Sequence, residues 1–276
     1  LSENPKNKVL LLEAGGEDNY HWIHIPIGYL YCIGNPKVDW MYNTEKEKGL
    51  NGRSINYPRG KVLGGCSSIN GMIYMRGQSR DYDLWSQLGA KGWGWDDVYP
   101  YFLKSEKYHT LKSGHSQDGE MLVEKPRIRW EILNSIQKAA NEIGIPHTED
   151  FNLGNNEGCG YFEVMQKRGR RWSASRAFLE PVKQRPNLKI ITNSQVINLE
   201  FEQDICSGLI FKKKSKKYRV RSSNEVILSA GSIGSPQLMM LSGLGDADEL
   251  KSHGLSVLKH IPGIGKNLQD HLQIRT

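Results

Sequence analysis

The chain has 276 residues, of which 38% are hydrophobic and 24% are charged, and its formal net charge is +7. This composition is that of an ordinary globular protein, and the length corresponds to about two domains. No apolar run approaches the roughly 18 residues that a membrane helix needs, and the four widely spaced cysteines indicate neither a zinc site nor a disulfide framework.

The first predicted element is a strand over Lys8–Gly16, a short apolar run that ends in Glu13 and two glycines. Such runs are typical of strands buried in a parallel sheet. In a dinucleotide-binding unit the second strand ends in an acid that binds the ribose hydroxyls, and Glu13 occupies that position, although many other strands also end in Glu. The matching first strand and its G-x-G-x-x-G turn would lie before Leu1, so we expect the chain to be a fragment.

The segment 20–57 is irregular, with a hairpin turn at Asn51-Gly52. We interpret it as a segment that covers the fold, not as a separate domain, and call it the covering excursion. It leads into Tyr57–Arg76, which is too apolar for a surface loop and too rich in glycine for a helix. Gly64 and Gly65 permit backbone conformations closed to other residues and let the main chain lie against a ligand. The small polar residues that follow place N–H donors where a helix could begin. The alternative is a buried glycine turn between two elements.

Helices and strands alternate along the rest of the chain. Helices are predicted over residues 81–88, 96–102, 130–143 and 173–179. Strands are predicted over residues 121–123, 161–165, 188–192, 196–201, 206–211 and 218–221. The helix over 130–143 is amphipathic, with one apolar face. The alternation of apolar and polar residues between 196 and 221 predicts a three-stranded antiparallel meander.

Basic residues crowd the segment Lys212–Arg221. A nucleic acid or an anionic membrane would match this charge. No nucleic-acid-binding signature accompanies it, and Tyr218 is the single aromatic residue among the basic ones. We favour a solvated β-hairpin with basic residues at its exposed positions, and we predict no nucleic-acid partner.

A second glycine turn is predicted near the C-terminal end. Glu225–Gly231 has the pattern of a buried strand, and Ser235-Pro236 is expected to open a helix with proline in its first turn. A strand, a glycine turn and a helix together aim backbone amides at a ligand from the carboxyl edge of a parallel sheet. Because Gly64 and Gly231 supply two such points in one chain, a large polyanionic cofactor is favoured over plain strand–helix connections.

Three long motifs resemble those of a known family. Pro58–Gly71, Gly231–Gly245 and Pro262–His271 are similar, in this order, to blocks of the glucose–methanol–choline flavoprotein oxidoreductases. Gly92-Trp93 and Val98–Phe102 fit as well, and the match extends over essentially the whole chain. The residues of these motifs are most similar to those of the choline-dehydrogenase-like alcohol dehydrogenases of that family.

The resemblance implies an α/β fold (α+β overall), in which a Rossmann-like FAD-binding domain carries an inserted antiparallel-sheet substrate domain, both incomplete in this chain. We expect the FAD domain at 1–80 and 172–276 and the substrate domain at 81–171, with a return to the substrate domain starting near the C-terminus. The implied activity is oxidation of a choline-like or other primary alcohol to the aldehyde, with hydride passing to flavin N5. The fragment by itself is expected to be inactive.

Family roles carry over onto matching positions. Glu13 would hold the adenosine ribose, and Val196 would meet the adenine through its backbone. The residues expected to line the pyrophosphate and flavin are Arg59, Val62, Gly64, Gly65, Ser67, Asn70, Gly71, Met72 and Ile73. Ala230, Asn267 and Asp270 are expected near the cofactor.

Members that bind FAD covalently carry a His just before the Asn of the first motif. This chain has Ile69 at that position, so a non-covalent FAD is predicted. The partners implied are a small alcohol and an electron acceptor, either oxygen, a quinone or another carrier. With no transmembrane segment predicted, the location implied is cytoplasmic or peripheral to the inner membrane.

The catalytic His of the family, with its His or Asn partner, lies well beyond the third motif, so no catalytic residue is expected before Thr276. There the pair would remove the hydroxyl proton and steady the alkoxide, work suited to a near-neutral imidazole. His271 is expected to be structural, and His21 and His24 lie in the covering excursion. Surface or loop positions are expected for His109, His115, His147, His253 and His260. No metal site is predicted.

Two functional hypotheses remain from the sequence. The first is an FAD-dependent alcohol dehydrogenase. The second is a non-catalytic flavin- or nucleotide-binding module on the same fold. A His–Asn or His–His pair downstream in the full gene would favour catalysis, and its absence would favour binding alone.

Overall fold

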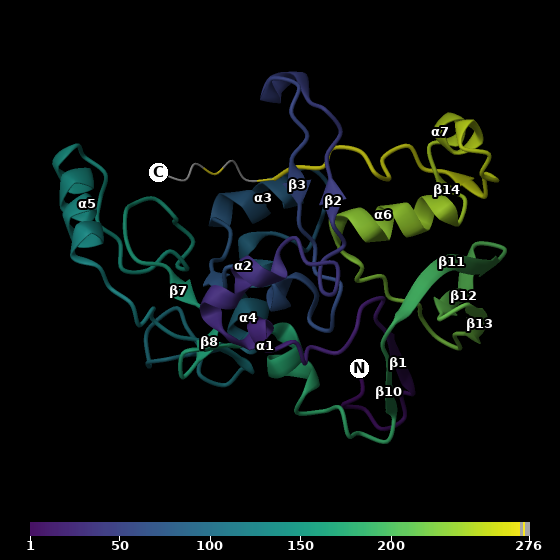
Figure 1. The fold of residues 1–276 in the computed structure, drawn as a ribbon, viewed down its shortest axis with the longest axis horizontal. Coiled ribbons are helices and arrows are strands. Elements are labelled where there is room, and N and C mark those ends of the chain that lie inside the picture. The colour runs from purple at the N-terminus through teal and green to yellow at the C-terminus, as the bar shows by residue number, and fades with distance from the viewer. Residues whose placement is uncertain (271–272, 274–276) are drawn as a thin grey trace. The chain divides into compact units, whose positions relative to one another are not determined.

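The computed structural model describes residues 1–270 and 273, and it divides into two compact units. The first unit comprises Leu1–Leu10 and Gly15–Ile190, and the second comprises Leu11–Ala14 and Ile191–Thr276. Each contains helices and small sheets (Figure 1), the mixture expected of an α/β protein. The domain boundaries at residues 81 and 172 stay predictions.

The first unit consists of short elements joined by long connections. Its helices and helical turns are α1 (His21–His24), η1 (Pro26–Gly28), α2 (Tyr29–Cys32), η2 (Lys48–Leu50), η3 (Gly65–Ser68), α3 (Ser79–Gln87), α4 (Trp95–Ser105), α5 (Glu131–Glu142) and η4 (Ser175–Leu179), the last a π-helix. Its strands are β2 (Tyr42–Asn43), β3 (Asn56–Tyr57), β4 (Ile73–Tyr74), β5 (Glu106–Tyr108), β6 (Met121–Val123), β7 (Glu163–Val164), β8 (Gln166–Lys167) and β9 (Arg170–Arg171). Strands β2–β3, β4–β7 and β8–β9 pair antiparallel, and β5–β6 pair parallel. Strands β1 (Val9–Leu12) and β10 (Leu188–Ile191) form a further two-stranded sheet.

Local signals in the sequence explain several of these elements. Asn51 and Gly52 have φ of +54° and +71°, and they turn the chain between β2 and β3 as predicted. The carboxylate of Asp97 accepts from the Gly94 N–H at 3.0 Å, so an acidic side chain caps the start of α4. The carboxylate of Asp81 does the same for α3.

A core cluster in the first unit ties the covering excursion to the glycine-rich stretch. Ile23, Cys32 and Val38 of the excursion pack with Val62 and Ile69, and all five are at most 2% exposed. Burying each large aliphatic side chain contributes about 1.5–3 kcal/mol, so this cluster fixes the backbone on which the stretch lies.

The predicted amphipathic helix is present as α5, but its apolar face is open. Trp130, Ile132 and Ile136 are 61%, 61% and 52% exposed, and α5 lies at the edge of its unit (Figure 1). With 12 residues it is short, and among the described residues no helix has both the length and the apolarity needed to cross a membrane.

The second unit contains the predicted meander. Strands β11 (Ser194–Glu202), β12 (Ile205–Lys213) and β13 (Lys216–Arg221) pair antiparallel in sequence order. Helix α6 (Gly231–Leu241) lies along β11 in Figure 1, and just after it the Ser242 hydroxyl accepts from the Leu199 N–H at 2.9 Å. Strands β14 (Leu244–Gly245) and β15 (Lys259–His260) pair parallel around α7 (Ala247–Ser252).

The predicted strand over Glu225–Gly231 is wrong. These residues form no strand, and Ile227 is 57% exposed. A strand needs a hydrogen-bonded neighbour, and no segment among the described residues pairs with this run. Helix α6 also begins at Gly231, so Pro236 lies in its second turn instead of opening it.

Candidate functional site

The stretch Tyr57–Arg76 folds as a glycine turn, a one-turn helix and a short strand. Gly64 and Gly65 have φ of +87° and +53°, in the left-handed region that other residues rarely adopt. A Cβ on Gly64 would lie 2.5 Å from the Ser68 Oγ and 3.2 Å from the Ser175 Cβ, so no side chain fits there. Both glycines therefore adopt the conformations that the sequence predicts for them.

This stretch is anchored on the turn that follows β1. Val62 bridges to Gly16 in parallel register, and the Leu63 N–H donates to the Gly16 carbonyl at 3.0 Å. A Cβ on Gly15 would lie 1.9 Å from the Lys61 carbonyl oxygen, so the two backbones are in direct contact. The turn at Gly15-Gly16 and the turn at Gly64-Gly65, distant in sequence, therefore meet within the first unit.

Arg171 of β9 holds the stretch from the inside. Its Nε donates to the Ile23 carbonyl at 2.7 Å, and its Nη2 donates to the Asn70 carbonyl at 2.6 Å. Its Nη1 donates to the Ser67 carbonyl and to the Asn70 Oδ1, both at 3.0 Å. The residue is 2% exposed, and burial among these neutral acceptors lowers the pKa of its guanidinium to about 10. The sequence shows only arginines around a glycine here and does not predict this role.

Further hydrogen bonds fix Ser67 and Asn70. The Ser67 hydroxyl donates to the Gly64 carbonyl at 2.5 Å and accepts from the Ala174 N–H at 2.9 Å. The Asn70 Oδ1 also accepts from the N–H of Met72, which has a φ of +64°, at 3.0 Å. Because Asn70 Oδ1 is already bonded to Met72 and Arg171, its Nδ2 is the end of the amide that remains for a ligand.

One side of the stretch is open. Nothing lies within 4 Å of a Cβ built on Gly65 or on Gly71. Near these glycines Ile73 and Met75 are 46% and 42% exposed. Accessible backbone beside apolar side chains is what a ligand with a polyanionic part and a flat apolar part requires.

Other predicted residues of this stretch can take part only in a limited way. The side chains of Val62 and Met72 are buried in the protein, so they offer a ligand backbone groups alone. The Arg59 guanidinium lies 4.0 Å from the centre of the Tyr57 ring. The Arg59 N–H donates to an Asp39 carboxylate oxygen at 3.1 Å, so this residue is held half-buried at the start of the stretch.

The remaining predicted residues lie in the second unit, where Glu13 and Val196 are close in the fold. The Glu13 N–H donates to the Ile191 carbonyl at 3.0 Å, and its carbonyl accepts from the Ser194 N–H at 2.8 Å. Val196 follows in β11, just before a register shift between Val196 and Asn198. The residue predicted to hold a ribose therefore lies beside the strand predicted to meet the adenine.

Ala230, Asn267 and Asp270 also belong to the second unit, and all three are exposed. Ala230 precedes α6, and its N–H donates to the Ser235 hydroxyl at 3.1 Å. The next residue, Gly231, has a φ of +80° and nothing within 4 Å of a built Cβ, so the start of α6 is open. Asn267 and Asp270 lie in the irregular segment after β15.

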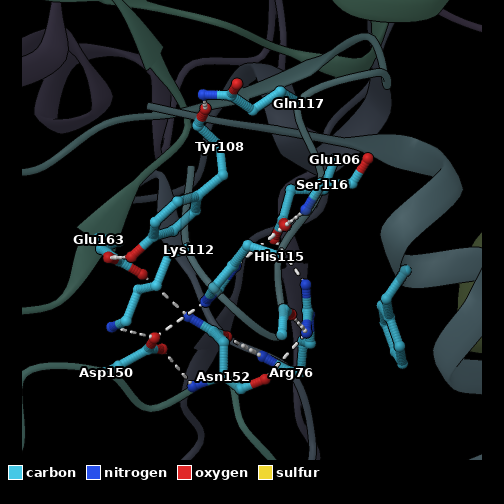
Figure 2. Close-up of polar contacts among 12 residues, drawn as sticks. Arg76, Glu106, Tyr108, Lys112, His115, Ser116, Gln117, Asp150, Asn152 and Glu163 are labelled. Atoms are coloured by element: carbon cyan, nitrogen blue, oxygen red, sulfur yellow. Dashed lines mark hydrogen bonds and ion pairs between the residues drawn. The ribbon is translucent and has the colours of Figure 1, made fainter. Parts of the chain in front are cut away.

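A second polar cluster in the first unit is buried (Figure 2). The His115 Nδ1 lies 2.9 Å from a Glu106 carboxylate oxygen, and its Nε2 lies 2.9 Å from a carboxylate oxygen of Asp150. The Arg76 Nη2 donates to the other Glu106 oxygen at 2.7 Å, and the Lys112 Nζ lies 2.7 Å from Asp150. The side chains of Arg76, Glu106 and His115 are at most 1% exposed. Cations and anions thus alternate along a chain of contacts that ends at Lys112, whose side chain is 37% exposed.

His115 was predicted to be a surface or loop residue, and it does lie in the loop between β5 and β6, but its ring is not at the surface because it is sealed between the two carboxylates. The Tyr108 hydroxyl donates to Glu163, and the Asn152 Nδ2 donates to the same carboxylate at 3.2 Å, which extends the network. The available signal was weak: Glu106 follows an amphipathic helix, and periodicity does not separate a buried acid from a solvated one. The network joins β5 and β7 to the loops that hold Arg76, His115 and Asp150, so it positions the end of the Tyr57–Arg76 stretch.

The network predicts a loss of stability at alkaline pH. Burial alone would lower the pKa of His115, but Asp150 and Glu106 outweigh burial and raise this pKa to about 9. A raised pKa in the folded state stabilises the protein fully below about 6.5, the unfolded value, and this stabilisation is lost as pH rises through 9. We expect the free energy of unfolding to fall by about 3 kcal/mol over this range, as measured by urea denaturation at several pH values. A His115→Gln variant should lack this dependence, and an unchanged profile in the variant would contradict the assignment.

Comparison with known proteins gives a consistent result. A family model described as GMC oxidoreductase matches residues 10–273. The chain is 42% identical to an alcohol dehydrogenase [acceptor] of Pseudomonas putida, over 99% of this chain and 50% of that protein. It is 40% identical to the mitochondrial choline dehydrogenase of Homo sapiens, over 99% of this chain and 48% of that protein. The chain therefore spans about half the length of these curated relatives.

Solved structures with the same fold are also known. A pyridoxine 4-oxidase from Mesorbium loti superposes with a TM-score of 0.89 and 31% identity, over 95% of this chain and 52% of that one. An FAD-dependent oxidoreductase from Chaetomium thermophilum superposes with a TM-score of 0.90 and 30% identity, over 98% of this chain and 49% of that one.

Proposed function

The chain belongs to the GMC oxidoreductase family, and from this premise we propose that the protein is an FAD-dependent oxidoreductase that converts a primary alcohol into the aldehyde. The relatives named for alcohol and choline dehydrogenation support an alcohol or choline-like substrate. The observation that carries the proposal for this chain is the open glycine backbone of the Tyr57–Arg76 stretch beside exposed Ile73 and Met75.

The described residues fit FAD on their own chemistry. Gly65 and Gly71 have free space where other residues would place a Cβ, so the backbone can approach a large cofactor closely. The Nδ2 of Asn70 supplies a side-chain donor, and Ile73 supplies apolar surface. When bound, FAD would supply the hydride acceptor that alcohol oxidation needs.

The second unit contributes the other proposed contacts. Glu13 would accept hydrogen bonds from the ribose, and Val196 would contact the adenine through its backbone. The open start of α6 at Ala230 is suited to negative charge, because the first N–H groups of a helix have no partner within it. Asn267 and Asp270 complete the proposed set with exposed polar side chains.

We assign no catalytic base to the described residues. His115 is enclosed by two carboxylates, and His24 lies 3.2 Å from the Arg176 guanidinium, so both rings are engaged in structure. We propose that the base belongs to the part of the relatives' length that this chain does not span. The electron acceptor, whether oxygen, a quinone or another carrier, is part of the same proposal.

The proposed activity is tested on the full-length, flavin-loaded protein, which includes the part of the relatives' length that this chain does not span, by adding primary alcohols, choline included, without oxygen. Bleaching of the visible flavin band is expected with at least one alcohol, because hydride transfer reduces the flavin. Reoxidation by oxygen, a quinone or an artificial dye then identifies the acceptor class. Bound flavin that no alcohol bleaches would favour the non-catalytic module instead.

We further propose that the FAD is bound without a covalent bond. Ile69, at the position where covalent members carry a His, is 2% exposed and packs in the core cluster with an inert aliphatic side chain. Precipitating the flavin-loaded protein with acid is expected to release the yellow flavin into the supernatant. Flavin that stays with the washed pellet would show a covalent bond through another residue.

A further inference from the structure

The hairpin formed by β12 and β13 concentrates positive charge at one end. We name residues 212–221 the basic hairpin. Its basic residues are Lys212, Lys213, Lys214, Lys216, Lys217, Arg219 and Arg221. Arg219 lies 2.9 Å from Glu200, and among residues 1–270 no ion pair involves the other six. The acids of this sheet lie toward its other turn, where Glu202 and Asp204 are found.

The register places like charges directly opposite one another. Lys212 pairs with Lys217, and Lys213 pairs with Lys216 across the two strands. Like charges in such positions destabilise a sheet by a few tenths of a kcal/mol or more. The arrangement costs folding energy, and an anionic partner would relieve the repulsion.

One face of the basic hairpin is basic along its whole length. Side chains two residues apart in a strand share a face, so the register puts four basic residues on one side. These four are Lys212, Lys217, Arg219 and Arg221. The opposite face carries Phe211, which is 5% exposed and stacks on Tyr218 with ring centres 5.2 Å apart. The face with Phe211 and Tyr218 also carries Lys213 and Lys216 near the turn, and the other face, which we name the outer face, carries the four basic residues without an aromatic one.

The form of this face selects among anionic partners. Single-stranded nucleic acids stack their bases on aromatic side chains, but Tyr218, the single aromatic residue of the basic hairpin, lies on the other face, where it stacks on Phe211. Stable protein interfaces usually centre on a buried aromatic or apolar anchor, and the basic residues of the outer face surround no such anchor, since Ile210 between them is half-buried. Clusters of four to eight basic residues are attracted to anionic lipid by charge alone.

We propose that the basic hairpin docks the protein on an anionic phospholipid surface. The long, flexible lysines keep their solvation while they approach the lipid headgroups, so no pocket is needed. The interaction is electrostatic and therefore weakens as salt rises.

The test compares two variants of equal net charge. The first replaces Lys212, Lys217 and Arg221 of the outer face and Lys214 of the turn with Gln. The control replaces four other exposed lysines, Lys46, Lys48, Lys91 and Lys104, with Gln. Co-sedimentation is measured with vesicles of phosphatidylcholine alone and with a two-to-one mixture of phosphatidylcholine and phosphatidylserine, and circular dichroism verifies that both variants are folded.

The unmodified protein is expected to bind the mixed vesicles and not the neutral ones. Each basic side chain near an anionic membrane contributes about a fivefold gain in partitioning, so the hairpin variant should partition about 100-fold or more weakly. The control variant should bind almost like the unmodified protein. Equal losses in both variants, binding retained by the hairpin variant, or no vesicle binding together with binding to DNA or to an acidic protein would each overturn the proposal.

Discussion

Replacing Arg171 with alanine is expected to lower the free energy of unfolding by about 3–5 kcal/mol and to abolish FAD retention. The guanidinium is the shared donor for the carbonyls of Ile23, Ser67 and Asn70. Without it these carbonyls lose their partner in a buried place, and each such loss costs about 1–3 kcal/mol. The freed Asn70 would also lose the orientation that presents its Nδ2 to a ligand.

Two further variants separate the loss of the Arg171 hydrogen bonds from the loss of a positive charge. Arg170→Ala removes an equal charge from the adjacent exposed position, so stability and flavin content should stay near those of the unmodified protein. Arg171→Lys keeps the charge but cannot reach four acceptors with a planar fork, so it should recover little of either property. Urea denaturation and the ratio of flavin to protein absorbance measure both effects. Arg171→Ala protein that behaves like Arg170→Ala protein would exclude the anchoring role.

Replacing Glu106 with glutamine is expected to destabilise the first unit by about 3–5 kcal/mol, although the side chain keeps its size. The carboxylate neutralises Arg76 and His115, whose side chains are buried, and removing it leaves buried positive charge uncompensated. Hydrogen bonds from His115 and from the Ser116 N–H, together with Arg76, outweigh burial and hold the pKa of Glu106 below its usual range. A lowered pKa adds stability above the unfolded value near 4.5, and this stability is lost as pH falls further.

Glu120→Gln, at an exposed position, serves as the matched control, and it should change stability by less than about 0.5 kcal/mol. Arg76→Met combined with Glu106→Leu removes both charges of one pair, so it should cost less than the two single changes added together. Thermal and urea unfolding of the unmodified protein, the Arg76→Met and Glu106→Leu single variants and the double variant measure this coupling. Additive losses would show that the two side chains do not act as a pair.

Sequence patterns predicted those elements whose stability is mostly local. The helices predicted over 81–88 and 96–102 are observed as α3 and α4, and the turn at Asn51-Gly52 and the alternation along β11 to β13 are observed as well. They depend on capping bonds, on positive φ and on neighbouring strands joined by short turns, all of which are visible within a few residues.

The features that the sequence did not predict depend on contacts between elements that lie far apart in the sequence. The run over Glu225–Gly231 has the composition of a buried strand, but pairing partners decide whether a strand forms. The apolar stripe of α5 was correctly predicted, yet whether such a stripe is covered depends on other elements. His115 was predicted to be a surface or loop residue, and it lies in a loop, but the burial of its ring depends on Glu106 and Asp150, which enclose it only in the folded chain.

The candidate site likewise has features that the sequence determines and features that depend on the folded chain. The sequence by itself determined the family motifs, the glycines at 64 and 65 and the cofactor class that they suit, because glycine is required wherever φ is positive or backbones touch. Only the tertiary structure decided how that stretch is held. Arg171 reaches three carbonyls from a distant strand, and Arg76 ends the stretch in a buried network of charges. Burial and partners are properties of the folded chain, and they determine whether a charged residue is a solvated surface group or a structural anchor.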